Sequence, residues 1–307
     1  SGFIIIKAHK SHFFRPGEFL EYARKRVIRI YPVYWIIFLG VYFTALLIPS
    51  LKNSVPQDFQ AVVEALILLP QDKSVVGGTG AAVLIVAWSL QYEMVFYLFT
   101  GLLFLKKLLS YSLIAISAVV FSLYLLDLIP YFPLSYLSIE YISLFMMGAF
   151  VANYYAKEYF TMNFSKLLLG GGFLLVSTLS IDVITQLNFA ENNRIVLFGF
   201  GYTLIVVGLI SLEDFRVIIG GNPFFQLVGG ASYALYLIHF PLISIMLKIA
   251  MGLGLKELGM AGAVISFIVI FISCIVASIL FHLYIEIPMM RKLAQYKFKR
   301  PIVESSI

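Results

Sequence analysis

Two ionisable side chains stand inside long apolar stretches and are the first candidates for chemistry. Glu93 lies in the run 88–97, and His239 lies in the run 232–241. An ionisable group inside an apolar span is costly to keep, so its presence points to a function. Glu93 could act as a general base or orient a hydroxyl, with helix bridging as its structural alternative. His239 could instead be a packing residue, although Pro241 nearby would loosen backbone bonds and favour a functional bend.

Polar and aromatic neighbours accompany both groups at helical spacing. Ser89 and Tyr97 each lie four residues from Glu93, so an α-helix would place them one turn away. Trp88 begins the same run, and Tyr236 lies three residues before His239. We therefore expect these four residues to contact a substrate or to support the motif that holds it.

Weaker candidates have structural explanations. Glu286 lies at the end of the last apolar run, where an ion pair with nearby cations is the alternative to a role in the site. Cys274 is the single cysteine, cannot form an intrachain disulfide, and is expected to be a packing residue. His9 and His12 have metal-compatible spacing but no acidic or thiol ligand nearby, so we expect a solvated loop and no metal site.

A basic cluster precedes the first long apolar run. Four cations, Arg24, Lys25, Arg26 and Arg29, lie within six residues, and an aromatic segment begins at Tyr31. Arginine binds phosphate bidentately, so this cluster is the best place in the chain for a phosphate-rich ligand. The alternative is topological, because basic residues collect on the cytoplasmic side of a membrane span.

The elements that position these groups are expected to be membrane-spanning helices. The chain is 61% hydrophobic and 12% charged, with a mean hydropathy of +0.95, whereas a soluble domain carries roughly 25% charged residues. Apolar runs of about 20 residues recur along the chain and are continuous rather than alternating, which favours an all-α polytopic bundle. Spans are predicted at roughly 32–49, 88–105, 109–129, 136–154, 166–184, 195–211, 232–250 and 260–284.

Proline, glycine and one short apolar run mark breaks and contacts in this pattern. Pro32 is expected at the end of a span, where a missing backbone N–H costs little. The apolar segment 59–69 is too short to cross a membrane and predicts an interfacial or re-entrant helix. The glycines at 170–172 and the pair Gly199 and Gly201 predict close helix–helix contacts.

The distribution of cations sets the expected orientation. With residues 7–31 inside, 17 of the 22 Lys and Arg residues fall on the inner side of the predicted spans. This asymmetry predicts a multi-pass membrane protein with about eight complete crossings and both ends of the chain in the cytoplasm. We expect a membrane domain over residues 1–290 and a short basic tail over 291–307. The net charge of +6 is not taken as a sign of nucleic-acid binding.

Taken together, the sequence blocks resemble the membrane-bound acyltransferase 3 family, the O-acyltransferases that decorate cell-surface glycans. The blocks are Ser1-Gly2-Phe3, Arg26-x-x-Arg29-Ile30-Tyr31-Pro32-x-Tyr34-Trp35, Trp88-Ser89-Leu90-x-x-Glu93-x-x-Phe96-Tyr97, Ser232-Tyr233-x-Leu235-Tyr236-Leu237-Ile238-His239-x-Pro241 and Ile285-Glu286-x-Pro288. They are colinear and cover essentially the whole chain.

The resemblance implies a ten-span fold in the inner membrane that transfers an acyl group, expected to be acetyl, from cytoplasmic acyl-CoA. The acceptor would be a hydroxyl of a cell-envelope polysaccharide or a lipid-linked sugar. Arg26 and Arg29 would serve the CoA, and Glu93 and His239 would be the candidate catalytic residues of the polar site. Besides these ligands, only membrane lipids are expected as partners.

The family's first span carries an Arg and the His thought to be catalytic, and neither has a counterpart here. We therefore expect the chain to be an N-terminally truncated fragment that begins with the end of a helix. His239 matches a different motif, so it is not assigned as that His.

Two other classes of protein remain as alternatives. A transporter or exporter of a lipid-linked sugar would also hold ionisable residues in its spans, but transporters often show inverted halves that this sequence lacks. A non-catalytic membrane scaffold would not need Glu93 and His239 in apolar runs.

Overall fold

A computed structural model of the chain describes residues 1–49, 51–72, 76, 79–126, 128, 139–154, 161–186, 194–214 and 222–295. All regular structure in these residues is helical. The chain divides into two compact units, each of which is described by itself. The first contains Ser1–Ala23, Asp58–Ala82 and Ala87–Phe225, and the second contains Arg24–Gln57, Val83–Val86 and Gln226–Ile307.

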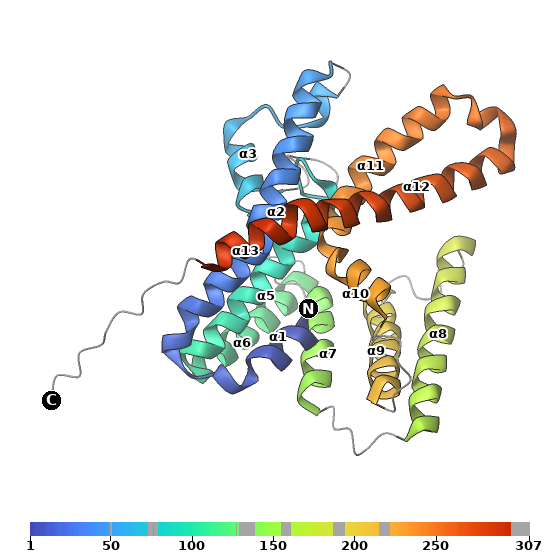
Figure 1. Cartoon of the computed structure of the whole chain (residues 1–307). Helices are drawn as coiled ribbons and strands as arrows, with labels where there is room; N and C mark the ends of the chain where they lie inside the picture. The colour runs from blue at the N-terminus through green and yellow to red at the C-terminus, as the bar shows by residue number, and fades with distance from the viewer. Residues whose placement is uncertain are drawn as a thin grey trace. The chain divides into compact units, whose positions relative to one another are not determined.

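Figure 1 labels the helices along the chain. The first unit holds α1 (Gly2–His9), α3 (Phe59–Leu66), α5 (Trp88–Leu105), α6 (Lys107–Leu125), α7 (Ile139–Tyr154), α8 (Met162–Thr185) and α9 (Arg194–Asp214). The second holds α11 (Ser232–Gly252), α12 (Gly259–Phe281), a π-helical turn (His282–Glu286) and α13 (Ile287–Gln295). Helices α2 (Phe19–Leu47) and α10 (Pro223–Gly230) have residues in both units. Short 3₁₀ turns lie at Lys10–His12, Pro16–Glu18, Lys52–Ser54, Ile85–Ala87 and Leu255–Leu258.

The prediction of an all-α membrane protein is confirmed. Five helical stretches among the described residues are long and apolar enough to cross a membrane, namely Pro16–Leu47, Met162–Thr185, Arg194–Leu212, Ser232–Gly252 and Leu255–Gln295. Helix α5 covers the predicted span 88–105 residue for residue, and Tyr141–Asn153 in α7 is a shorter apolar helix. The domain boundary predicted after residue 290 falls inside α13, and residues 296–307 lie outside the described part of the chain.

Pro32 lies inside a helix, so the prediction that it marks a helix end is wrong. Helix α2 runs without interruption for 29 residues and joins the amphipathic segment to the apolar one. A proline in a helix removes one backbone hydrogen bond. Membrane helices tolerate this loss because neighbouring helices and local adjustments satisfy the freed carbonyl. The rule that proline marks a helix end, which holds for helices in water, therefore predicted a start for α2 that is too late.

The apolar segment after α2 forms the short helix that its length predicts. Helix α3 has eight residues, or roughly 12 Å at 1.5 Å per residue, which is well short of a membrane core of about 30 Å. Asp58 caps its first turn by accepting a hydrogen bond from the backbone N–H of Ala61 at 2.9 Å.

His9 does not lie in a solvated loop, and that prediction is wrong. It is the last residue of α1, is half-buried, and its ring meets Tyr22 edge-on at 5.2 Å and Phe104 at 6.0 Å between centroids. The chain after α1 is held against α5 because the backbone N–H of Phe14 donates to Leu103 O at 2.9 Å. The aromatic cluster, and not water, therefore surrounds one face of the imidazole.

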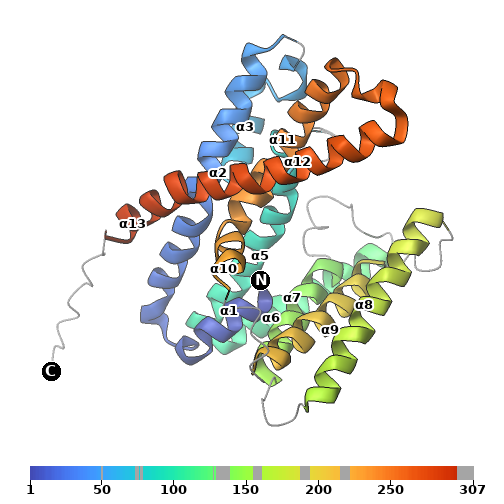
Figure 2. The ribbon, with the colours of Figure 1, turned by 45° about the vertical axis from the view of Figure 1, so that its right-hand side comes forward.

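Glycines bring α8 and α9 into close contact, as predicted from their sequence. The two helices lie side by side in Figures 1 and 2. A Cβ on Gly172 would lie 2.7 Å from Ile205 Cγ1 and 2.8 Å from Gly201 O, and a Cβ on Gly208 would lie 2.8 Å from Leu169 N. Of the glycines at 170–172, only Gly172 makes such a contact. Small residues at these positions let the backbones approach, which is how helices associate in lipid.

Gly172→Val should therefore destabilise the protein by about 1–3 kcal/mol, the usual cost of overpacking a tight contact. The matched control is Gly171→Val, since a Cβ on Gly171 meets nothing within 4 Å. Both changes add the same side chain to the same helix, so the difference isolates the contact with α9. Thermal unfolding in detergent should show a lower Tm for Gly172→Val alone. Equal Tm values for the two variants would contradict the contact.

Candidate active site

Glu93 is held by two hydroxyl groups in the first unit. Its Oε1 accepts a hydrogen bond from Tyr97 Oη at 2.7 Å, one helical turn away on α5. The same oxygen accepts a second bond from Ser1 Oγ at 3.0 Å, which comes from the residue that caps α1. A carboxylate has about four lone-pair sites, so Glu93 keeps capacity to accept a further hydroxyl group. The predicted neighbourhood of Glu93 and Tyr97 is confirmed by this geometry.

Close backbone packing places Ser1 beside Glu93. A Cβ on Gly2 would overlap Phe145 O of α7, and a Cβ on Gly148 would lie 2.8 Å from the backbone nitrogen of Phe3. Only glycine fits at either position, which gives a physical reason for the Ser1-Gly2-Phe3 block. Phe96 of α5 stacks on Phe145 at 4.7 Å, so α1 and α5 both pack on α7.

The aromatic residues of the same block pack against neighbouring helices. Trp88 meets Tyr141 of α7 at 5.5 Å and Tyr92 at 6.1 Å between centroids. Tyr22 Oη donates to the backbone carbonyl of Tyr97 at 3.0 Å. The structure thus gives Trp88 a packing role, while Ser89 lies half-buried on the first turn of α5.

Gln91 is a residue that the sequence analysis missed. It is buried, and its Nε2 donates to Leu69 O at 2.9 Å and to Gly80 O at 3.1 Å. One side chain on α5 therefore joins both ends of the segment that follows α3. The signal that could have revealed it is a polar amide inside an apolar run, which needs partners when water is absent. Its partners, however, lie on irregular backbone that no periodicity predicts.

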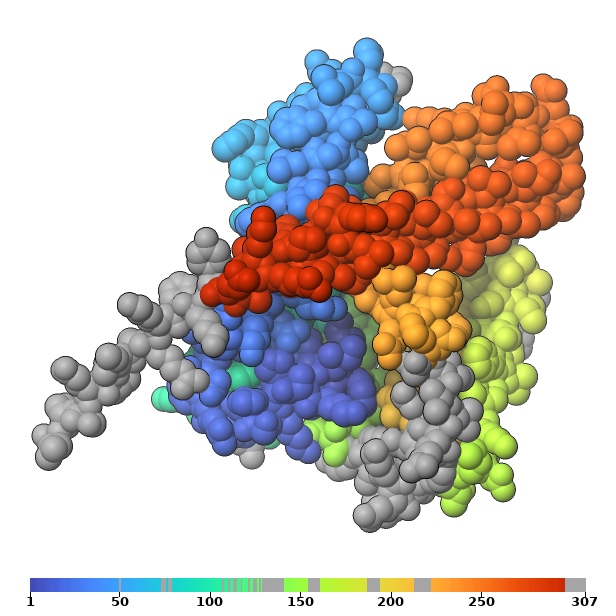
Figure 3. All heavy atoms as spheres, viewed as in Figure 1, coloured from blue at the N-terminus to red at the C-terminus, as the bar shows by residue number. Residues whose placement is uncertain are grey.

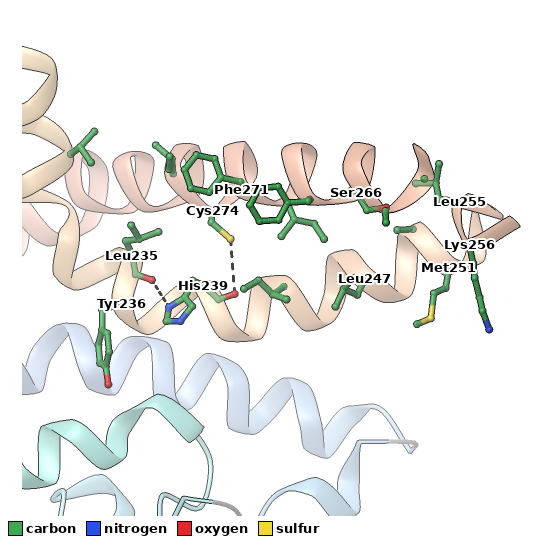
Figure 4. A pocket seen from close by; sticks show the side chains of 18 of the residues that line it. Leu235, Tyr236, His239, Leu247, Met251, Leu255, Lys256, Ser266, Phe271 and Cys274 are labelled. Atoms are coloured by element: carbon green, nitrogen blue, oxygen red, sulfur yellow. Dashed lines mark hydrogen bonds between the residues drawn. The ribbon is translucent and has the colours of Figure 1, made fainter. Parts of the chain in front are cut away.

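His239 lies in the second unit, and one of its ring nitrogens forms a hydrogen bond within its own helix. Nδ1 is 3.0 Å from the backbone carbonyl of Leu235 on α11. A carbonyl only accepts, so this bond assigns the proton to Nδ1 and leaves Nε2 with a lone pair. Figure 4 shows the ring beside the groove between α11 and α12. Nε2 is the atom of His239 that can accept a proton or a hydrogen bond from a ligand.

The two tyrosines of the same block anchor α11 rather than face a ligand through their hydroxyls. Tyr233 Oη donates to Ile30 O of α2 at 2.9 Å. Tyr236 Oη donates to the backbone carbonyl of Val86, and its side chain points away from α12 in Figure 4. Tyr236 was predicted as a substrate or motif residue, and the geometry supports the motif role. These bonds fix the start of α11 and hence the place of His239.

Glu286 pairs with a histidine in the π-helical turn. Its carboxylate is buried and lies 2.8 Å from His282 Nδ1. Pro288 explains the turn, because it cannot donate to residue 284 and would clash with that carbonyl in an α-helix. A Cβ on Gly230 would lie 2.9 Å from His282 Nε2, so the pair packs at the end of α10. The i,i+4 spacing of His282 and Glu286 was a signal in the sequence that went unused.

Arg26 and Arg29 lie one turn apart on α2, in the same unit as His239. Arg29 is exposed and Arg26 half-buried. Ile30, the neighbour of Arg29, is the residue whose carbonyl binds Tyr233 at the start of α11. Arg29 is therefore next in sequence to the residue that contacts the first turn of α11, and Arg26 lies about one turn earlier on α2. Glu93 belongs to the first unit and His239 to the second.

Comparison with known proteins agrees with the blocks that build these two sites. A family model described as an acyltransferase domain matches residues 1–283, which is most of the chain and includes residues of both units. No curated protein and no solved structure shows a match. With a family match of this extent, and with five helices among the described residues able to span a membrane, the chain belongs to the acyltransferase 3 family and is a membrane acyltransferase.

Proposed function

We propose that the protein is an O-acyltransferase that moves an acyl group from cytoplasmic acyl-CoA to a hydroxyl of an envelope glycan. The acceptor is a polysaccharide or a lipid-linked sugar, and the resemblance favours acetyl-CoA as the donor. The observation that carries the proposal is the Tyr233–Ile30 hydrogen bond, which ties the helix of His239 to the basic turn of α2. A basic turn on α2 that is tied to the helix of His239 suits a phosphate-bearing thioester.

The two sites take separate roles in this proposal. Arg26 and Arg29 bind phosphates of the donor, and His239 Nε2 lies beside its thioester. Glu93 is the candidate base for the acceptor hydroxyl, since a carboxylate can take up its proton. The net reaction bonds the hydroxyl oxygen to the thioester carbonyl carbon and breaks the carbon–sulfur bond, and CoA leaves as the thiolate. Ser1 and Tyr97 hold the carboxylate of Glu93 in position through their hydroxyl groups.

The cation distribution supports a location in the inner membrane with residues 7–31 and the C-terminal tail in the cytoplasm. In this orientation the basic turn of α2 meets the water-soluble donor, since 17 of 22 Lys and Arg residues fall on that side. The same orientation puts Lys52 and Lys256 on the opposite side of the predicted spans. The orientation therefore assigns the donor to the cytoplasmic face and the acceptor to the other face.

Sealed vesicles of both orientations test the proposal. Inverted vesicles containing the full-length protein should transfer label from added acyl-CoA to envelope glycan, because their outer surface is the cytoplasmic face. Right-side-out vesicles should transfer label only after they are made permeable. Mass analysis of the glycan identifies the acyl ester. Equal transfer by intact vesicles of both orientations would contradict the proposed sidedness, and no ester in either would contradict the proposed activity.

A further inference from the structure

A long groove between α11 and α12 has no role in the chemistry described so far. Its volume is about 1040 Å³. The two helices, orange in Figure 3, lie side by side along the hairpin that they form. Figure 4 shows the lining side chains, which come from both helices and are predominantly apolar. Leu247 and Met251 of α11 and Phe271 of α12 are among them.

The groove starts at the candidate donor site. His239 and Cys274 lie on opposite walls, with Cys274 Sγ 4.0 Å from the backbone carbonyl of His239. Tyr233, less than two turns before His239, binds Ile30 beside Arg29. The imidazole therefore lies toward the end of the groove that is nearer the basic turn of α2. Apart from Ser266, the lining side chains beyond His239 are apolar as far as the hairpin loop.

The other end of the groove lies at Lys256 in the hairpin loop. From His239 to Met251 the helix rises roughly 18 Å at 1.5 Å per residue. An acetyl group beside His239 would leave nearly all of this length empty. A groove of this length and polarity fits an extended hydrocarbon chain.

We propose that this groove holds the acyl chain of the donor, and that the donor is a long-chain fatty acyl-CoA rather than acetyl-CoA. The inference rests on the proposed function and names the substrate class of its donor site. The phosphates of CoA lie at Arg26 and Arg29, the thioester lies beside His239, and the chain extends between α11 and α12 toward Lys256. It departs from the acetyl group that the family resemblance favours.

A fatty acyl thioester is a better occupant than a lipid of the bilayer. The tail of a bilayer lipid already lies among hydrocarbon and gains no hydrophobic energy on entering the groove. The chain of a water-borne thioester leaves water when it enters, and this transfer is favourable. The charges agree, because the arginine pair on α2, next to the Ile30–Tyr233 contact, can bind a phosphate-rich head better than Lys256 alone at the other end.

Chain-length selectivity tests the inference. The full-length protein should use palmitoyl-CoA with a kcat/KM at least tenfold higher than that for acetyl-CoA. Ala263→Phe adds a ring to the groove wall and should lower kcat/KM for palmitoyl-CoA at least tenfold, with little change for acetyl-CoA. Ala261→Phe is the matched control, since Ala261 is exposed on the same helix and does not line the groove. Acetyl-CoA used as well as palmitoyl-CoA, or equal effects of the two variants, would overturn the inference.

A binding experiment separates this inference from the proposed function. Palmitoyl-CoA with a photoreactive group at the end of its chain should crosslink to residues 247–251 of α11 or 259–266 of α12. Unlabelled palmitoyl-CoA should compete, and acetyl-CoA and a diacyl phospholipid should not. Crosslinking with this pattern supports the groove assignment even where no glycan ester forms, in which case the acceptor half of the proposed function fails alone. Competition by phospholipid as strong as that by palmitoyl-CoA would make the groove a lipid site and overturn the assignment.

Discussion

Glu93→Gln is expected to lower the rate of acyl transfer by about 10²- to 10⁴-fold, the usual contribution of a general base. The amide oxygen of Gln can still accept hydrogen bonds from Tyr97 Oη and Ser1 Oγ, which lie 2.7 and 3.0 Å from the carboxylate. The fold around α1 and α5 should therefore persist while the negative charge and the basicity are lost. The loss should appear in kcat, measured with labelled donor and saturating glycan.

Tyr97→Phe is the companion variant for this experiment. It removes one donor to the carboxylate but leaves the base, so it should cost less activity than Glu93→Gln. Membrane insertion and Tm should match the unchanged protein in both cases. If Glu93→Gln is fully active while Glu93→Ala fails to accumulate, Glu93 is a structural bridge between helices and not a base.

Replacing both Arg26 and Arg29 by Ala should raise KM for acyl-CoA by about 100-fold or more, with a small change in kcat. Each charge-assisted hydrogen bond to phosphate contributes roughly 1.5–3 kcal/mol, and 1.4 kcal/mol corresponds to a tenfold change. Lys at both positions should restore only part of the affinity, because the ammonium cannot form the bidentate pair. The measurement is donor KM in inverted vesicles, at low and at physiological salt.

Lys52→Ala supplies the control for net charge, since Lys52 is an exposed cation beyond the other end of α2. It should leave donor KM unchanged. A double arginine variant with an unchanged KM would show that the two side chains serve membrane insertion alone. The positive-inside effect would then account for the whole basic cluster.

The helical type of the long apolar runs was predicted from the sequence, although the start of α2 was predicted too late, at Pro32 instead of Phe19. An apolar run of membrane length forms a continuous helix because backbone N–H and C=O groups are costly to expose to lipid. Helix α5 matches the predicted 88–105 for this reason. The contact between Glu93 and Tyr97 could also be predicted from the sequence, because residues four apart lie on one face of a helix.

Contacts between distant segments were decided only by the tertiary structure. Ser1 lies 92 residues from Glu93, and Tyr233 lies 203 residues from Ile30, so no local period relates either pair. Gln91 reaches irregular backbone whose carbonyls are placed by the fold. The groove at His239 is likewise formed by α11 and α12 together, so it could not be predicted from either helix alone. Sequence periodicity reports the face of one helix, whereas a site made from several helices depends on how those faces are brought together.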